Sequence, residues 1–552
     1  MKRAFLSVLL LLFLSVFSFA SEKAAEHSLL FKDVKVEALN NGLSFKLSAT
    51  KDLAYVSVVI GFLPNEKAYY PVYRFSQNHF VSGKEADILI KWKKFRWYLN
   101  NEKTLVFYKI NLLGKDGYQE QYKSRVLLSR NKKILQTVVN GPYISRGEKD
   151  FYKVWFELLY PDTAELVFNG KTYKCEEKKT RHVFEIGRLE KGNYTYFVKG
   201  YPRVFTARIN ETQNFSFAFM SDSRNTKTDF DSNFQNVNGQ IIPKVFLTAY
   251  QKGVDFFLFV GDLVSGYTRY PEEFERELKS FLYATEPVSS FVPVYTGMGN
   301  HEALIDCLKD KEGKKFCRDK KPPFSAEDIF AKVFENPENG DFTEKEGLPP
   351  YKENVYYFDY GNCLFVVLNT NYWWAKDPEI HGGNLEGYIM DRQMEWLENV
   401  LKTKGKGKRE IFVFAHEPAF PVSAHLKDGM YYWGGDPAKN NGIDRRYVLK
   451  MRDRFLKILD RHGVKLVCFG DEHNYSRVLI NKDIAPVKGE ITQIISGGAG
   501  APFYELAPEF PWKKNLQAFS KENHFILVNV GKTIKVDVVS IHGYVVDSFE
   551  IK

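Results

Sequence analysis

Five short apolar runs between residues 215 and 475 each end in an acidic, amide or imidazole side chain. Each run has the length of a buried strand and helical stretches separate the runs, which is the pattern of an α/β domain. Side chains placed after such strands meet at one sheet edge, where α/β folds place their chemistry. The residues at these ends are Asp222, Asp262, Asn300 with His301, His416, and Asp471 with His473.

These side chains form a ligand set for a metal ion. Carboxylate, amide and imidazole groups together suit divalent manganese, iron or zinc, and the cysteines have no spacing typical of a thiolate site. Any one such strand end is common, and a lone histidine after a strand more often has a structural role. Five of them in order, each closing an apolar strand, specifically indicate a metal centre.

The chain before the α/β region is strand-like throughout. Alternating runs fill residues 28–135, and shorter strands that include Trp155 fill residues 138–209, which is typical of small β-sandwiches. We therefore expect a multidomain chain, with N-terminal β-sandwich-like domains followed by an α/β domain over residues 213–552. A stretch rich in lysine, glutamate and proline, residues 320–355, is expected to be a surface insertion.

Composition narrows the class of protein. Hydrophobic residues make up 44% of the 552 residues, so a disordered chain is excluded and several cores can form. The net charge of +10 is thin for a chain of this length, so we expect no nucleic-acid partner, although the charge would suit anionic substrates. The sequence carries no signal for a particular oligomeric state.

The first twenty residues have the features of a signal peptide. Lys2 and Arg3 precede an apolar run, and residues 18–20 form a small-x-small cleavage site. The expectation is a signal peptide over residues 1–20, an exported protein (periplasmic or secreted), and no stable membrane span after cleavage. The alternative is an uncleaved membrane anchor.

Export permits disulfides, and the chain has five cysteines. Cys307 and Cys317 flank a charged, loop-like stretch and are expected to pair. Cys363 and Cys468 lie in apolar, strand-like runs and are expected to be small buried residues.

The order of the strand-end motifs resembles the calcineurin-like metallophosphoesterase superfamily and, within it, the purple acid phosphatases. That family's motifs run D-x-H, G-D, G-N-H-E/D, a lone H and G-H-x-H. Here they stand as DSR, GD, GNHE, H and GDEH, at 222–224, 261–262, 299–302, 416 and 470–473. GYIMDRQMEWLENVL and SGGAGAPFY resemble further segments of the family, and GPYISRGEKDFYKVWFE resembles the opening of its small fibronectin type III-like domain.

The resemblance covers residues 138–552, whereas residues 28–135 match no family. It implies a fibronectin type III-like domain over residues 138–209 and a four-layer α/β/β/α metallophosphoesterase domain over residues 213–552. It also implies a dinuclear centre of two divalent or trivalent ions (iron, manganese or zinc), at which a metal-bound hydroxide attacks a phosphate ester.

The resemblance also assigns roles to single residues. Asp262 would bridge both ions, with Asp222 and His473 on the first ion and Asn300 and His416 on the second. Asn300, His301 and His425 would bind substrate. Arg224 departs from the family pattern and is our own further candidate for a substrate-binding and catalytic residue.

Two histidines are candidates for the general acid. His301 would protonate the leaving group or hold a phosphate oxygen, with Glu302 as an orienting carboxylate. His425 lies where plant enzymes of this type carry a substrate-facing histidine and is the second candidate; alternatively, it is an ordinary surface-loop histidine.

Two positions depart from the family pattern. Arg224 stands where many relatives have a histidine for the first ion, and Asp471 where they have one for the second. The added charges offset each other, which indicates a coherent variant. We expect Asp471 to bind the second ion and Arg224 to bind substrate phosphate or Asp471, because a guanidinium pairs well with oxyanions. The alternative is that Arg224 only neutralises Asp471 and the second ion is weak or absent.

The sequence therefore predicts an exported, metal-dependent, acid phosphatase-like hydrolase that acts on phosphate monoesters of phosphorylated small molecules. One alternative is a phosphodiesterase or nucleotidase with the same centre. Another is a catalytically weak surface-binding protein, in which the β domains carry the function. A nuclease is disfavoured because the charge is mild and no basic stripe lies near the motifs.

Overall fold

The computed structural model describes residues 27–551 except for 66–67, 100, 226–228, 310–312, 314 and 376–380. The predicted signal peptide lies outside the described residues. No helix within the described part of the chain is both long and apolar enough to span a bilayer.

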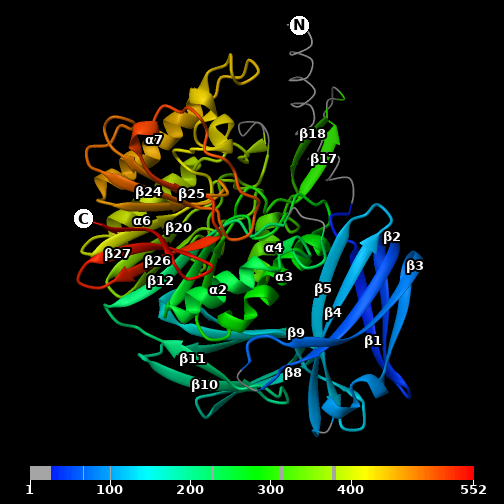
Figure 1. Cartoon of the computed structure of the whole chain (residues 1–552). Helices are drawn as coiled ribbons and strands as arrows, with labels where there is room; N and C mark the ends of the chain where they lie inside the picture. Colours follow the sequence, from blue (N-terminus) through cyan, green and yellow to red (C-terminus); the bar gives the residue numbers. More distant parts are fainter. Residues whose placement is uncertain are drawn as a thin grey trace.

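The first sheet is antiparallel and is formed by the alternating runs of the N-terminal region (Figure 1, blue to cyan). Alternate side chains of its strands point into one core, as in β2, where Val56, Val58 and Ile60 are fully buried. The strands pair in the order β1-β2-β4-β5-β6, and β3 also pairs with β2. Their bounds are β1 Phe31–Leu39, β2 Gly42–Phe62, β3 Val72–Lys91, β4 Lys103–Gly114, β5 Gln119–Ser129 and β6 Ile134–Leu135.

The second sheet is also antiparallel and is organised around the long strand β8. The first half of β8 pairs with β7 and its last residues pair with β10, while β9 lies along its other edge. Trp155 of β8 is buried against Tyr143, with 4.5 Å between ring centroids, and joins the core of the following domain. The bounds are β7 Val138–Arg146, β8 Tyr152–Phe168, β9 Lys171–Gly187, β10 Gly192–Val198 and β11 Phe205–Ile209.

Two further sheets form the α/β region. In the first, the order is β16-β15-β12-β26-β27-β28, with β12, β15 and β16 parallel. In the second, the order is β19-β20-β21-β22-β24-β23-β25, with β20, β21, β22 and β24 parallel. The bounds are β12 Phe215–Met220, β15 Phe256–Val260, β16 Val294–Gly297, β19 Tyr356–Tyr360, β20 Cys363–Val367, β21 Glu410–Phe414, β22 Leu466–Phe469, β23 Tyr475–Ile480, β24 Ile491–Ser496, β25 Leu516–Ser520, β26 His524–Val530, β27 Ile534–Ser540 and β28 Val545–Ile551.

An aromatic core lies between these two sheets. Phe217 of the first sheet contacts Phe365 and Phe412 of the second, with ring centroids 5.1 and 5.2 Å apart. Helices α2, α3 and α4 pack on the other face of the sheet that contains β12, and α6 and α7 on the other face of the sheet that contains β21. Their bounds are α2 Ile241–Gln251, α3 Pro271–Ser289, α4 Ala326–Val333, α6 Asp391–Lys404 and α7 Arg446–Arg461.

The expected surface insertion at residues 320–355 is wrong for a large part of that stretch. Ser325 caps helix α4 by accepting a hydrogen bond from the backbone N–H of Asp328. Phe330 and Val333 are buried in the core between the helices and the sheet that contains β12. Lysine and glutamate dominate the composition of the stretch, but its apolar residues fall on one helix face.

The short elements include a hairpin that carries the predicted disulfide. Strands β17 (Ile305–Lys309) and β18 (Lys315–Asp319) pair Cys307 opposite Cys317, and the two sulfurs are bonded. This prediction is confirmed, as is the burial of Cys363 and Cys468. The remaining short elements are β13 Asn233–Phe234, β14 Val237–Asn238 and the 3-10 turns η1 Trp92–Lys94, η2 Arg96–Tyr98, η3 Glu148–Asp150, η4 Ala424–Lys427, η5 Tyr432–Gly435 and η6 Lys513–Asn515.

A buried ion pair holds the first sheet against the α/β region. Arg125 of β5 donates hydrogen bonds to both carboxylate oxygens of Glu286 in α3, at 2.6 and 2.7 Å. The same guanidinium donates to the carbonyls of Val138 and Gly141 in the second sheet. Three parts of the chain therefore meet at one buried pair, and loss of either partner would leave the other charge unpaired.

Candidate metal centre

All five predicted strand ends meet at one place. Strands β12, β15 and β16 of one sheet and β21 and β22 of the other each end within three residues of a predicted ligand. The carboxyl ends of the parallel strands of both sheets face the same side, so the loops after them converge. The structure brings together Asp222, Asp262, Asn300, His301, His416, Asp471 and His473, with Arg224 and His425 around them.

The three aspartates share an unusual backbone conformation. Asp222, Asp262 and Asp471 have φ angles of 67°, 52° and 66°, in the left-handed region. Aspartate and asparagine tolerate this region better than most residues, and such conformations concentrate at functional sites. The turn after each strand thus fixes the direction in which each carboxylate leaves the backbone.

The glycines of the GD and GNHE motifs make room for His416. A Cβ atom at Gly261 would lie 2.0 Å from Nδ1 of this imidazole, and one at Gly299 would lie 2.6 Å from its Cδ2. Any larger residue would collide with the ring, so the motif glycines are a packing requirement of the site.

Two buried glutamates hold the loops in place. Glu302 accepts hydrogen bonds from the backbone N–H groups of Asp262, Leu263 and Gly299, at 2.9, 2.9 and 2.7 Å. Its predicted role was to orient His301, but it braces the ligand loops instead. Glu472 acts in the same way on the neighbouring loop, where it accepts from Val422, Ser423 and His425.

On one side of the centre lie Asp222, Asp262 and His473, which we call the first side. Their ligand atoms all lie within 4.8 Å of one another. His473 Nδ1 donates to the carbonyl of Pro502 at 2.6 Å, which leaves Nε2 facing Asp222 Oδ1 at 3.5 Å. A carbonyl on the far ring nitrogen is the usual way to orient a metal-binding histidine.

Arg224 occupies part of the first side. Its Nε donates to Asp262 Oδ2 at 3.0 Å, and one terminal nitrogen lies 3.2 Å from His473 Nε2 and from the hydroxyl of Tyr504. The guanidinium therefore pairs with the predicted bridging carboxylate rather than with Asp471. Its prediction as a partner of Asp471 is corrected by this contact.

On the other side lie Asn300, His416 and Asp471, which together with Asp262 we call the second side. His416 Nε2 lies 3.1 Å from Asp262 Oδ1 and 3.7 Å from Asp471 Oδ1. Asn300 donates from its amide nitrogen to the hydroxyl of Tyr267 at 3.2 Å, which leaves its carbonyl oxygen for the centre.

Unsatisfied buried atoms show that this donor set fits metal ions. Among the described residues, several side-chain atoms of the site are buried without any hydrogen-bond partner: Asp222 Oδ1, Asn300 Oδ1, His416 Nε2, Glu417 Oε2 and Asp471 Oδ2. Such atoms are rare in proteins because burial without a partner is costly. Each of them could bind a cation, and oxygen and imidazole donors of this kind suit manganese, iron or zinc.

The carboxylate of Asp262 interacts electrostatically with most of the other titratable groups of the site. Burial acts against its ionisation, but the imidazoles of His301 and His416 outweigh burial and hold the pKa of Asp262 below its usual range. In turn, burial would lower the pKa of His416, but Asp262 and Asp222 raise it to about 10. Burial, with Arg224 nearby, lowers the pKa of His301 to about 3. A carboxylate that remains ionised between several groups is suited to bridging two cations.

The candidate substrate-binding side chains lie above the ligand layer. Side chains of Asp222, Asp262, His416, Asp471 and His473 are at most 2% exposed, whereas Arg224, His301 and His425 are 13–16% exposed. The structure therefore has a buried layer of ligand-type groups and a partly open layer of cationic and imidazole groups above it.

The sequence did not single out Glu417 or Tyr504. Glu417 follows His416 directly and is buried beside the second side, and its acidic type at that position was the available signal. Tyr504 stacks on His473 with 4.1 Å between ring centroids, a contact that depends on a turn thirty residues further along the chain.

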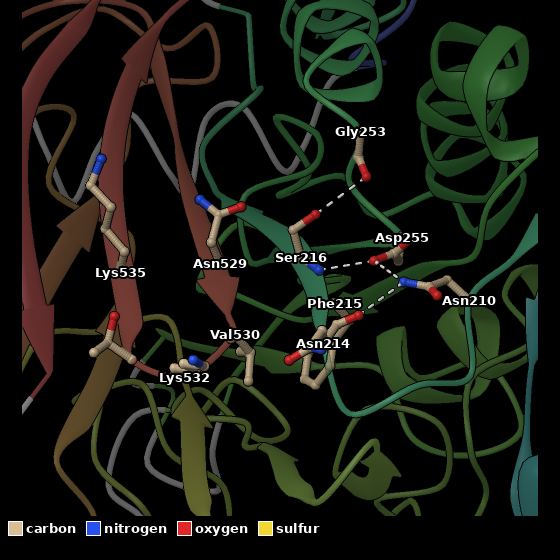
Figure 2. A pocket seen from close by; sticks show the side chains of 12 residues that line it. Asn210, Asn214, Phe215, Ser216, Gly253, Asp255, Asn529, Val530, Lys532 and Lys535 are labelled. Carbon is tan, nitrogen blue, oxygen red and sulfur yellow. Dashed lines mark hydrogen bonds between the residues drawn. The ribbon is translucent and has the colours of Figure 1, made fainter.

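The opposite end of the same strands is hollowed but carries none of the predicted site residues. A cavity of about 470 Å³ lies beside the amino end of β12 (Figure 2). Its Asp255 accepts hydrogen bonds from the backbone N–H of Ser216 and the amide of Asn210, at 2.8 and 3.0 Å. This carboxylate anchors the chain where the strands begin.

A family model matches the part of the chain that carries this site. Residues 215–475 match the family model of the calcineurin-like phosphoesterases. The matched residues contain all five strand-end motifs, and the match agrees with the resemblance that their order indicated. No curated protein matches the chain.

Several solved structures are similar in fold to this chain. The purple acid phosphatase PPD1 from yellow lupin (Lupinus luteus) seeds is similar with a TM-score of 0.55 and 14% identity, over 92% of each chain. This coverage extends the similarity of fold into residues 28–135, where the sequence resembled no family. PhoD matches with a TM-score of 0.47 and 11% identity, over 74% of this chain and 92% of that chain. A dimetal phosphatase from Danio rerio matches with a TM-score of 0.38 and 15% identity, over 61% of this chain and 98% of that chain.

Proposed function

We propose that the protein hydrolyses phosphate monoesters of small molecules in a metal-dependent reaction. The observation that carries this proposal is the two-layer site in a phosphoesterase domain: buried ligand-type groups with unsatisfied atoms lie beneath Arg224, His301 and His425. An anionic ester would meet cationic and imidazole groups first, with its phosphorus held over the ligand layer.

The residues that would hold two metal ions follow from the two sides. Asp222, Asp262 and His473 would hold the first ion, and Asp262, Asn300, His416 and Asp471 the second. Bound divalent ions would supply Lewis acidity and lower the pKa of water near the phosphorus. Manganese, iron and zinc are the candidate metals.

Arg224 would bind the phosphate group. Its Nε is engaged by Asp262, and its terminal nitrogens lie at the partly exposed layer, beside the hydroxyl of Tyr504. A guanidinium there would donate two hydrogen bonds to phosphate oxygens and stabilise their charge in the transition state. This favours a monoester dianion over the singly charged diester.

His301 would transfer the proton to the leaving group once a bound phosphate dianion raises its pKa, because in the free protein burial, with Arg224 nearby, lowers that pKa to about 3. Its Nδ1 donates to the carbonyl of Ser265 at 2.7 Å, which fixes the ring and leaves Nε2 for the substrate. Nε2 lies 3.8 Å from Asp262 Oδ2, close enough to act at the same reacting group.

We also infer that the protein is exported and that its α/β region has four layers. Export is supported by the leader-like sequence of residues 1–20 and by the disulfide between Cys307 and Cys317. The four-layer arrangement is supported by the core between the two sheets and by the helices on their other faces.

Paired substrates test the proposal. Hydrolysis of p-nitrophenyl phosphate and bis(p-nitrophenyl) phosphate should be measured with the manganese-, zinc- and iron-loaded protein. We expect faster hydrolysis of the monoester, and an Arg224→Met variant should have a KM for the monoester raised by about tenfold or more. Faster hydrolysis of the diester, with KM unaffected by Arg224→Met, would replace the monoesterase with a phosphodiesterase.

A further inference from the structure

The carboxylate of Asp471 faces two different groups. Its Oδ1 lies 3.7 Å from Nε2 of His416, toward the second side. Its Oδ2 lies 3.2 Å from Nδ1 of His425, away from the second side. A histidine at this position, as in the family pattern, would have a single ligand atom for one direction, whereas a carboxylate can serve two cations at once.

Glu417 completes a second group of ligand atoms around that outer oxygen. Donor atoms of Glu417, His425 and Asp471 all lie within 4.8 Å of one another. Glu417 is 5% exposed; its Oε1 accepts from the amide of Asn371 at 3.0 Å, while its Oε2 is buried without a hydrogen-bond partner. Asp471 Oδ2 is also buried without a hydrogen-bond partner, so two unsatisfied carboxylate oxygens face one imidazole.

The chain around Glu417 keeps its carboxylate in place. A Cβ atom at Gly387 would lie 2.5 Å from the carboxyl carbon of Glu417, and one at Gly429 would lie 3.2 Å from Oε2. Both glycines have positive φ angles, 79° and 59°, so the backbone itself passes close to the acid group. This group is therefore packed into a fixed position rather than solvated.

Negative charge around His425 exceeds positive charge. Asp428 Oδ1 lies 2.9 Å from Nδ1 of this histidine, in addition to Asp471 and Glu417. No lysine or arginine forms an ion pair with Glu417, Asp428 or Asp471 in the described part of the chain. Burying carboxylates without a compensating cation is costly, and a bound divalent ion would remove that cost.

We propose that Glu417, His425 and Asp471 hold a further divalent cation beside the two-ion centre. The cation would take the place of the proton on His425 Nδ1, between Asp428 and Asp471, and Asp471 would bridge it to the second ion. The donor set of carboxylates and one imidazole suits manganese, zinc or ferrous iron. The site rests on the proposed function in that it shares Asp471 with the second ion and takes His425 from the substrate-facing layer. His425 is then a ligand, and His301 remains as the proton donor.

Counting bound ions in matched variants tests the site. The full chain is stripped with a chelator, reloaded with Mn²⁺, freed of loose metal by gel filtration and analysed by mass spectrometry of the metal. Glu417→Gln should bind one ion fewer than the wild type. Glu353→Gln is the matched control, because Glu353 is 4% exposed and accepts from the backbone N–H of Asn336 at 2.9 Å, outside the site. It should bind as many ions as the wild type.

Two further measurements keep the test decisive. If Glu417→Gln does not fold, as judged by its thermal unfolding, His425→Gln should lose the same ion. In crystals loaded with Mn²⁺, anomalous scattering should place one ion between Glu417 and Asp471. An unchanged ion count in the folded variant, or no anomalous peak beside Glu417, would overturn the proposal.

The readout separates this inference from the proposed function, because ions are counted without substrate. A protein that hydrolyses no phosphate ester yet loses an ion in Glu417→Gln would retain the cation site and refute the esterase. An active esterase whose ion count is unaffected by Glu417→Gln would retain the esterase and refute the site.

Discussion

The two sides of the metal centre balance their charge in opposite ways. On the first side, Arg224 already pairs with Asp262 and lies against His473, so a cation of the chain itself shares the ligands. On the second side, the carboxylates of Asp262 and Asp471 face Nε2 of His416, and Asp471 lies beside a further acid, Glu417. The family pattern has a histidine on each side where this chain has Arg224 and Asp471, so the two substitutions move positive charge to one side and negative charge to the other.

This difference indicates that the two ions are bound unequally. A guanidinium repels a nearby dication by several kcal/mol at the effective dielectric of a partly buried site. An added carboxylate attracts one on a similar scale. The first ion should therefore be the more easily lost and the second the more firmly held, and four experiments test this difference.

Asp262 is common to both sides, so its replacement should have the largest effect. Asp262→Asn keeps a residue that tolerates the left-handed backbone but removes the bridging charge. We expect kcat for the aryl phosphate to fall by about a thousandfold or more. The control is Asp255→Asn at the opposite end of the strands (Figure 2), which should leave kcat within about threefold. Similar losses in both variants would mean that Asp262 acts through stability.

Asp222 and Asp471 offer a matched pair of variants, one for each side. Both have left-handed backbones and are fully or nearly fully buried, so Asp222→Asn and Asp471→Asn differ mainly in which ion they weaken. Each should raise the dissociation constant of its own ion by about a hundredfold, measured by competition with a fluorescent chelator. If Asp471→Asn leaves every ion as firmly bound as before, Asp471 is not a ligand and the comparison fails.

Removing Arg224 should strengthen metal binding. Arg224→Met frees Asp262 Oδ2 and His473 Nε2, and the first ion should bind about a hundredfold tighter or more, as measured by calorimetry. Arg477→Met is the control, because Arg477 pairs with Asp547 in another part of the chain, 2.9 Å away. Weaker metal binding in Arg224→Met would show that the guanidinium supports the first side rather than competing for it.

Loss of the disulfide in the β17–β18 hairpin should have the smallest effect on KM and on the ion affinities. Cys307, Cys317 and Tyr267 pack against the same small core of Ala303 and Ile305, and the ring of Tyr267 contacts that of His301, with 4.6 Å between centroids. Replacing both cysteines with serine should change KM by less than about threefold and leave the ion affinities unchanged, because no ligand moves with the hairpin. A change in either ion affinity would mean that the disulfide hairpin helps to set the difference in metal affinity between the two sides.

Much of the site could be predicted because it lies at strand ends. Apolar runs that close on Asp222, Asp262 or His416 are local features, and parallel strands bring their ends together whatever the loops do. Other local patterns predicted the β-rich N-terminal region, from its alternating runs, and the pairing of Cys307 with Cys317, from the short charged stretch between them. The family motifs supplied the order in which the ends meet.

Other features depend on contacts that no local pattern contains. The choice of Asp262 over Asp471 as the partner of Arg224 is set by the direction of the chain after β12. Burial of helix α4 was missed because the lysine and glutamate content of its surroundings concealed its apolar face. The position of the Glu417 carboxylate depends on Gly387 and Gly429, which pack against it from up to thirty residues away in the chain.

The central claim is that this centre hydrolyses phosphate monoesters with metal ions held by both sides. The most direct test is the rate of p-nitrophenyl phosphate hydrolysis by chelator-stripped protein as Mn²⁺ is added back. If the claim holds, we expect no activity in the stripped protein and a rise that begins only after the second side has filled, because the firmly held second ion binds before the first. Activity that persists in the stripped protein, or that is absent after full reloading of the folded chain, would contradict it.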